Sequence, residues 1–292
     1  MQEFAYERPR TLGEAVAAMQ GGEARALAGG TDLIPQLREG RRRAARIVDL
    51  KGVPELTAVT SLPDGGVAIG AAASATAVAR HALVALRYPA VASSARLIGS
   101  LQIQNRASLG GNICNAAPSG DAIPALVCHR ARVAIAGPAG RRESDLEALF
   151  EGPGRTVLAA GEILAAILLP PPPPRSAACY LRFTPRREMD IAVAGAGVWI
   201  ELGDGGAVAA ARVVLASVAP TPIRAPAAEA RLVGEMPSPA LFAEAGRLAA
   251  GNARPISDTR GSADYRRSLV AVLTERALAD CSRALGIGVA KP

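Results

Sequence analysis

A run of small and polar residues, set between two helix-like segments, constrains the fold of this chain more than any other feature. It covers residues 106–124 and reads RASLGGNICNAAPSGDAIP. Glycine has no side chain and tolerates positive φ, so Gly110 and Gly111 predict a sharp turn that presents main-chain N–H groups to a ligand. Phosphate is the ligand that such a turn suits best. Taken alone, the run also fits a long, well-capped loop without a ligand.

The run also carries short polar side chains that can form hydrogen bonds with a bound group. These side chains belong to Ser108, Asn112, Asn115, Ser119 and Asp121. The carboxylate of Asp121 is suited to sugar hydroxyls. Ser119 or Asp121 can also cap the apolar segment 123–128 and direct its helix N-terminus at an anion.

A second glycine segment precedes this run in the chain. Its residues are Ala28, Gly29, Gly30, Thr31 and Asp32, which follow a short apolar run and precede an expected helical turn. The order strand, glycine turn, helix is typical of phosphate binding. The segment is neither the dinucleotide fingerprint, which needs three glycines at fixed spacing, nor a P-loop, which needs a following Gly-Lys-Ser/Thr. Alone it would more often be a tight turn, but two such segments in one basic chain favour a site.

Three segments together carry a resemblance to a known family. They are AGGTD at residues 28–32, SLGGNICN at 108–115 with SGD at 119–121, and FTPRREMDIA at 183–192. In this order they resemble the flavin-binding medium subunit of molybdenum hydroxylases. That group contains carbon monoxide dehydrogenase, xanthine dehydrogenase and related aldehyde or heteroarene oxidoreductases. The resemblance covers nearly the whole chain, and its second segment is the most specific.

The resemblance implies an FAD cradle. Residues 28–32 and 108–112 would hold the pyrophosphate through main-chain N–H groups, with polar contacts from Asn112, Asn115, Ser119 and Asp121. Ile98 matches a position that packs near the cofactor in relatives, or is plain core. Further residues placed near the flavin ring by the resemblance are Ile163, Leu164, Arg182 and Ile191.

Two of these assignments leave alternatives open. Arg182 stands where relatives have a lysine near the ring, but it also fits a strand residue with its charge in solvent. The turn 186–190 is a candidate gate for the electron acceptor, or an exposed charged turn. No histidine or cysteine lies beside Gly29 and Gly30, so the FAD is expected to be bound non-covalently.

The resemblance also leads us to expect partner subunits. An iron–sulfur small subunit with [2Fe-2S] clusters and a molybdopterin large subunit would complete the complex, as a dimer of heterotrimers. This chain would pass electrons from reduced FAD to NAD, oxygen or a quinone, and it would hold no catalytic residue and no metal. One alternative is a stand-alone flavin-dependent oxidoreductase. Another is a non-catalytic assembly subunit that binds a nucleotide only structurally.

Composition excludes several other classes. The formal net charge of +7 is not matched by stacking rings, because only 3% of residues are aromatic, and nucleic-acid binding is therefore not expected. The four cysteines form no C-x-x-C pair, and the two histidines, His81 and His129, are expected at the surface without metal partners. No apolar run approaches the roughly 20 residues of a membrane span, and the N-terminus lacks a secretory pattern. A cytoplasmic location is the resulting expectation.

The chain is expected to be an α+β protein of two domains. Five prolines at residues 170–174 cannot continue a central strand, so the boundary is placed there. The resemblance implies that residues 1–174 form an FAD-binding domain of the PCMH type. Its subdomains would cover about residues 1–55 and 56–174. Residues 175–292 would form a three-stranded antiparallel sheet with helices over 239–250 and 262–285. In the last helix, the residues assigned to the core are Tyr265, Leu269, Val272 and Leu273.

Overall fold

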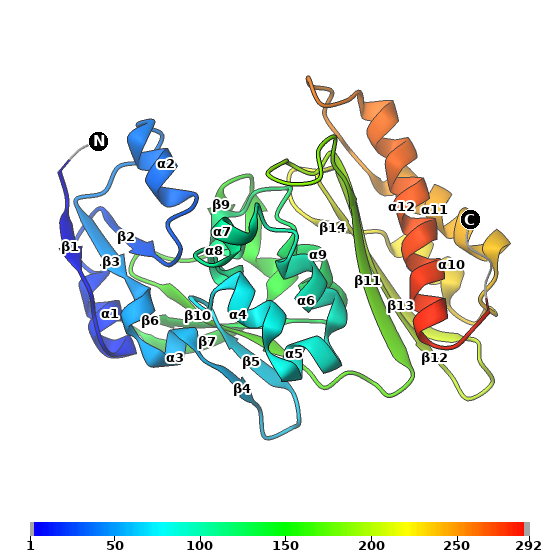
Figure 1. Cartoon of the computed structure of the whole chain (residues 1–292), viewed down its shortest axis with the longest axis horizontal. Helices are drawn as coiled ribbons and strands as arrows, with labels where there is room; N and C mark the ends of the chain where they lie inside the picture. Colours follow the sequence, from blue (N-terminus) through cyan, green and yellow to red (C-terminus); the bar gives the residue numbers. More distant parts are fainter. Residues whose placement is uncertain (1–2, 289–292) are drawn as a thin grey trace.

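The computed structural model describes residues 3–288, which form three units in a row along an elongated molecule (Figure 1). The first unit is a three-stranded parallel sheet with strand order β1-β3-β2. Its elements are β1 (Ala5–Glu7), α1 (Leu12–Ala18), β2 (Ala24–Leu27), α2 (Leu33–Arg38) and β3 (Arg46–Asp49). Thr11 caps α1, since its side chain accepts a hydrogen bond from the amide of Glu14 at 3.2 Å. The expected order of strand, glycine turn and helix at the first glycine segment is confirmed, since β2 precedes residues 28–32 and α2 follows them.

The middle unit is a five-stranded antiparallel sheet covered by short helices. The strand order is β4-β5-β10-β6-β7. The strands are β4 (Val59–Ser61), β5 (Val67–Gly70), β6 (Arg132–Gly137), β7 (Gly140–Asp145) and β10 (Ile163–Leu169), with a small pair β8 (Phe150–Gly152) and β9 (Arg155–Thr156). The helices are η1 (Leu50–Gly52), α3 (Pro54–Thr57), α4 (Ala75–Arg80), α5 (Ala82–Arg87), α6 (Pro89–Ala95), α7 (Leu101–Gln104), α8 (Leu109–Asn115), α9 (Ala122–Cys128) and η2 (Leu146–Leu149).

The third unit is an antiparallel sheet packed between two helical layers. Its strands are β11 (Ser176–Phe183), β12 (Ala194–Leu202), β13 (Val208–Ala216) and β14 (Ile223–Arg224), and its helices are α10 (Pro226–Leu232), α11 (Pro239–Asn252) and α12 (Ala263–Ala284). Helices α10 and α12 cover one face and α11 packs on both of them, while α6 and α9 of the middle unit cover the other face. Burial on both faces explains why β12 is apolar almost throughout.

Several expectations about local structure need correction. The sheet of the third unit has four strands, because β14, only two residues long, adds to the expected three. His129 is buried rather than at the surface, and its ring packs edge-on against Tyr88 at 5.3 Å between centroids. In α12, Tyr265 and Val272 are 44% and 41% exposed, so the core assignment fails for these two.

The five prolines connect β10 to β11 between the middle and third units. The Tyr88 hydroxyl donates a hydrogen bond to the carbonyl of Pro170 at 2.8 Å, which anchors the start of this connection. No helix within residues 3–288 is long and apolar enough to cross a membrane.

Two glycines of α11 give opposite stability predictions. A Cβ at residue 246 would lie 2.5 Å from the carbonyl oxygen of Ala271 in α12, whereas a Cβ at residue 251 meets nothing within 4 Å. We expect Gly246→Ala to lower the free energy of unfolding by about 1–3 kcal/mol, because the helices must move apart. Gly251→Ala should raise it by about 0.5–1 kcal/mol through helix propensity. Denaturant unfolding of both variants measures the difference, and equal effects would contradict the close packing of α11 on α12.

Candidate functional site

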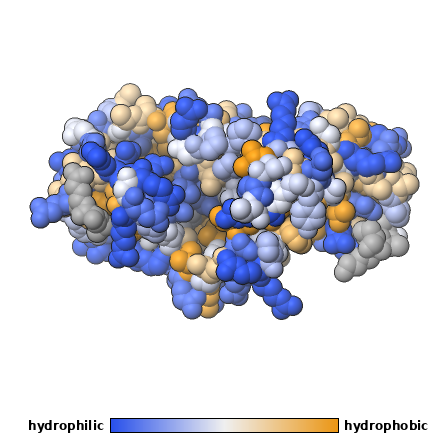
Figure 2. All heavy atoms as spheres, turned by 90° about the horizontal axis from the view of Figure 1, so that it is seen from above, coloured by the Kyte–Doolittle hydropathy of each residue, from blue (hydrophilic) through white to orange (hydrophobic). Residues whose placement is uncertain are grey.

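A cleft of about 630 Å³ lies where the three units meet. Residues from β2 and α2, from the segment 98–121, from the start of β10 and from the turn 189–191 line it. Seen from above in Figure 2, apolar surface is exposed in the recessed middle of the molecule, flanked by hydrophilic side chains. The cleft therefore offers both apolar and polar surface to one ligand.

The cleft gathers all but one of the site residues that the sequence predicted. The predicted residues that line it are Ala28, Gly29, Gly30, Thr31, Asp32, Ile98, Ser108, Gly110, Gly111, Asn112, Asn115, Ser119, Asp121, Ile163, Leu164 and Ile191. Arg182 is the exception. Residues that are distant in the sequence thus form one concave surface.

The first glycine segment turns tightly between β2 and α2. Gly30 has φ of 77°, a conformation that favours glycine. Within residues 3–288, the main-chain N–H groups of residues 29–32 donate to no protein acceptor. Consecutive free N–H groups at a turn form a concavity that binds anions. The segment therefore fits a phosphate group.

The second glycine segment is a helix and not the expected turn. Gly110 and Gly111 lie in the first turn of α8, where Ser108 is the N-cap and its hydroxyl accepts from the amide of Gly111 at 3.0 Å. The prediction of positive φ at these glycines is wrong. Helices leave their first N–H groups without intrahelical partners, so α8 still presents amides to the cleft.

The two glycines of α8 have different roles. A Cβ at residue 110 would lie 2.4 Å from the carbonyl oxygen of Ala71, so Gly110 permits close packing on the end of β5. A Cβ at residue 111 would meet only the Ser108 hydroxyl, at 3.1 Å. Since Gly111 lines the cleft, the space beside it is available to a ligand.

Polar side chains join the two glycine segments. Gln36 of α2 donates a hydrogen bond from Nε2 to Oδ1 of Asn115 in α8, at 3.0 Å. The Oδ1 atom of Asn112 accepts from the amide of Ala122 at 3.4 Å. The side-chain amide nitrogens of both asparagines remain available to a ligand.

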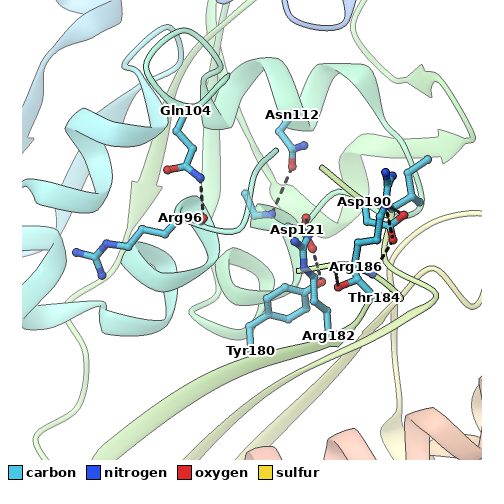
Figure 3. A network of polar contacts seen from close by, with 11 residues as sticks. Arg96, Gln104, Asn112, Asp121, Tyr180, Arg182, Thr184, Arg186 and Asp190 are labelled. Atoms are coloured by element: carbon cyan, nitrogen blue, oxygen red, sulfur yellow. Dashed lines mark hydrogen bonds and ion pairs between the residues drawn. The ribbon is translucent and has the colours of Figure 1, made fainter. Parts of the chain in front are cut away.

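Asp121 and Arg182 form a buried ion pair beside the cleft (Figure 3). Arg182 donates from Nη1 to Oδ2 of Asp121, and the Tyr180 hydroxyl donates to Oδ1 at 2.9 Å. The Arg182 side chain is only 6% exposed, so its charge does not lie in solvent and is paired with Asp121 instead. Asp121 stands at the N-cap of α9 but makes no capping hydrogen bond, which corrects the predicted cap. Burial raises the pKa of Asp121 to about 6, although Arg182 and Tyr180 act to lower it.

Apolar residues form another part of the cleft. Ile98 belongs to the core of the middle unit and also lines the cleft. Ile163 and Leu164 begin β10. Ile191 is 48% exposed, and it follows a turn closed by its own hydrogen bonds, since the Asp190 carboxylate accepts from the amides of Arg186 and Ile191. The amide of Met189 donates to the carbonyl of Gly99 at 3.3 Å, which ties this turn to the middle unit.

Other cleft residues were not predicted as site residues. They include Met19, Arg25, Gln36, Arg42, Leu50, Ile103, Cys114, Leu158, Glu162, Met189 and Asp190. Cys114, Met189 and Asp190 lie within the quoted segments 108–115 and 183–192, and no motif marks the rest. Arg25 and Arg42 bring positive charge from the first unit. A basic residue in β2 or after α2 has no sequence signal that separates it from an ordinary surface arginine.

Comparisons with known proteins agree with this geometry. The family of the "FAD binding domain in molybdopterin dehydrogenase" matches residues 2–172, and the "CO dehydrogenase flavoprotein C-terminal domain" matches residues 179–281. The carbon monoxide dehydrogenase medium chain of Hydrogenophaga pseudoflava is 30% identical over 277 residues, which cover 94% of this chain and 96% of that relative. A putative xanthine dehydrogenase FAD-binding subunit of Escherichia coli (strain K12) is 31% identical, covering 98% of this chain and 99% of that relative.

Solved structures give the same result. A carbon monoxide dehydrogenase structure from Hydrogenophaga pseudoflava superposes with a TM-score of 0.91 at 31% identity, covering 97% of this chain and 98% of that chain. Quinoline 2-oxidoreductase from Pseudomonas putida 86 also has a TM-score of 0.91, at 27% identity and with the same coverage. The chain belongs to the family of FAD-binding subunits of molybdenum hydroxylases, the oxidoreductases that include carbon monoxide dehydrogenase and xanthine dehydrogenase.

Proposed function

We propose that this chain receives electrons from an iron–sulfur subunit and passes them through FAD to a separate acceptor. The observation that carries the proposal is the meeting of two amide-rich segments in one cleft that also has an apolar part. The free N–H groups of residues 29–32 and the first turn of α8 suit a pyrophosphate. The apolar part suits a flat ring system. Together they match an asymmetric dinucleotide.

Each group of cleft residues has a role in this proposal. Residues 28–32 and 108–112 hold the pyrophosphate, and the sugar oxygens contact Asn112, Asn115, Ser119 and Asp121. Ile98, Ile163, Leu164 and Ile191 surround the ring. FAD supplies the capacity to accept and release electrons, while the protein binds and orients it. Arg182 acts on the site through Asp121, since it does not line the cleft.

The proposal includes non-covalent attachment of FAD. Cys114 is the cysteine that lines the cleft, and burial raises the pKa of its thiol to about 12. A thiol that stays protonated is a poor nucleophile. Covalent linkage through this cysteine is therefore disfavoured.

The proposed complex has three kinds of subunit. An iron–sulfur small subunit with [2Fe-2S] clusters and a molybdopterin large subunit join this chain, as a dimer of heterotrimers, and substrate is oxidised on the large subunit. Within this chain we propose an FAD-binding domain over residues 1–174 and a C-terminal domain over 175–292. The relatives support this arrangement, since their names describe medium chains and FAD-binding subunits.

The acidic residues of the cleft argue against a stand-alone oxidoreductase. Such an enzyme needs its own acid or base near the ring. Glu162 is bound by Arg142 at 2.7 Å, Asp190 closes its own turn, and Asp121 is held by Tyr180 and Arg182. Asp32 belongs to the glycine segment. Among the described cleft residues, none of these four carboxylates is without a partner and also lies among the apolar residues proposed to surround the ring.

The first experiment identifies the cofactor and the partners together. We expect the chain, purified by a tag from its native host, to show flavin absorbance, to release FAD on heating, and to carry two further subunits. One should contain iron–sulfur clusters and the other molybdopterin. A flavoprotein without partners would favour the stand-alone reading. A colourless chain that binds no added FAD would leave only the structural assembly role.

Gly111→Val tests the pyrophosphate site. The new side chain would fill the open space beside α8, so we expect the FAD dissociation constant to rise at least about tenfold. Gly13→Val is the matched control, because Gly13 lies in the first turn of α1 with nothing within 4 Å of its Cβ position and away from the cleft. Fluorescence titration of the FAD-free chain measures both. Equal affinities for the two variants would remove residues 108–112 from the proposed phosphate site.

The turn 186–190 is the proposed contact for a negatively charged acceptor such as NAD. The Arg186 side chain forms an ion pair with Asp190 and donates a hydrogen bond to the carbonyl of Met189, both in its own turn. The exposed Arg187 has no hydrogen-bond or ion-pair partner among the described residues. We expect Arg187→Glu to raise the KM for NAD up to about tenfold without changing flavin content. Arg276→Glu, an exposed position on α12, controls for net charge. An unchanged KM in Arg187→Glu would exclude this contact, and reoxidation by oxygen or quinone alone would exclude NAD.

A further inference from the structure

We infer that Tyr180 is a positioning residue of the cofactor site, which holds the Asp121 carboxylate at the cleft wall from the C-terminal domain. The inference rests on the proposed FAD site. Asp121 lines the cleft, but neither Tyr180 nor Arg182 does. The influence of β11 on a ligand therefore passes through one carboxylate.

The geometry around Asp121 is specific. Tyr180 donates to Oδ1 at 2.9 Å and Arg182 donates to Oδ2, so each carboxylate oxygen has one protein donor (Figure 3). A carboxylate oxygen accepts two hydrogen bonds, which leaves one free position on each for a sugar hydroxyl. The Tyr180 residue is 4% exposed, and the side chains of Arg182 and Asp121 are 6% and 10% exposed. Such burial fixes the direction in which the free positions point.

Glycines in β12 make this arrangement possible. Gly197 is the register partner of Tyr180, and Gly195 is the partner of Arg182. A Cβ at residue 195 would lie 2.6 Å from the Tyr180 hydroxyl oxygen, and a Cβ at residue 197 would lie 2.9 Å from Pro124 in α9. These two glycines therefore let α9 approach the sheet and leave room for the tyrosine hydroxyl to reach Asp121.

The hydroxyl also favours the acceptor form of the carboxyl group. The groups that face Asp121 are Tyr180 and Arg182, both on β11. Burial raises the pKa of Asp121, and both neighbours oppose this rise. Without the Tyr180 hydroxyl the carboxyl group takes up a proton at higher pH, and a protonated group loses part of its capacity to accept from sugar hydroxyls.

Tyr180→Phe tests the inference on the full chain freed of FAD. We expect the FAD dissociation constant at pH 7 to rise about tenfold, since one hydrogen bond to a charged group is lost. We also expect the acid-side loss of affinity to occur at higher pH than in the wild-type chain. Fluorescence titration over a pH series measures both effects.

Tyr88→Phe is the matched control. Tyr88 is a fully buried tyrosine of the same core, its hydroxyl also has a hydrogen-bond acceptor, and it does not line the cleft. We expect it to lower the melting temperature without moving FAD affinity or its pH profile. Equal loss of affinity in Tyr88→Phe and Tyr180→Phe would overturn the inference, because both would then act through general stability.

A second variant distinguishes a failure of this inference from a failure of the proposed FAD site. Asp121→Asn should weaken FAD binding, and adding Tyr180→Phe to it should produce no further loss. If Asp121→Asn binds FAD as the wild type does, Asp121 is not a contact and the inference fails while the flavin site stands. If the wild-type chain binds no FAD, the proposed function itself fails. If Asp121→Asn abolishes FAD binding but Tyr180→Phe binds FAD as the wild type does, only the positioning role of Tyr180 is excluded.

Discussion

The contact between Gly29 and the main chain of residues 106–107 is the constraint on which the site depends. A Cβ at residue 29 would lie 2.3 Å from the carbonyl oxygen of Arg106 and 2.7 Å from the Cα atom of Ala107. Only glycine allows this approach without moving backbone. It places the free amides after β2 beside the N-cap of α8, although the two segments belong to different units of the fold. The Gln36–Asn115 hydrogen bond then ties α2 to α8 across the same junction. One packing requirement thus joins the two segments that are proposed to hold the pyrophosphate.

The C-terminal domain completes the cleft although it has no glycine segment of this kind. Its sheet lies against α6 and α9, which brings β11 to Asp121 and the turn 189–191 to the apolar part of the cleft. The buried guanidinium of Arg266 strengthens the base of that turn, since it donates to the carbonyls of Val193 at 2.7 Å and Ser217 at 3.1 Å and binds Asp258. The position of Ile191 therefore depends on packing that reaches to α12.

Local patterns predicted much of this structure, and tertiary contacts decided the rest. The order of β2, Gly30 and α2 depends on residues that are close together in the sequence. The N-cap of α1 by Thr11 also depends only on neighbouring residues. The helical form of residues 109–115 was missed because Gly110 weakens a helix by propensity, whereas its contact with Ala71 exists only in the folded chain. The pairing of Arg182 with Asp121 links two domains, and no local rule predicts it. His129 was placed outside for the same reason, since Tyr88 and the middle sheet bury it.

The distribution of chemistry along the cleft favours one orientation of the proposed cofactor. The first unit contributes Arg25 and Arg42 together with the apolar Met19 and Leu33, and the two glycine segments contribute amides. The other large apolar side chains come from the middle unit and the turn 189–191. An anionic pyrophosphate on the amides leaves the apolar part for the ring, because a buried apolar surface is poorly suited to phosphate. The ring would then lie beside Met189 and Ile191, which are 54% and 48% exposed. Electrons would therefore leave the chain at the surface that the C-terminal domain forms, and that domain's turn, more than the glycine segments, would select the acceptor.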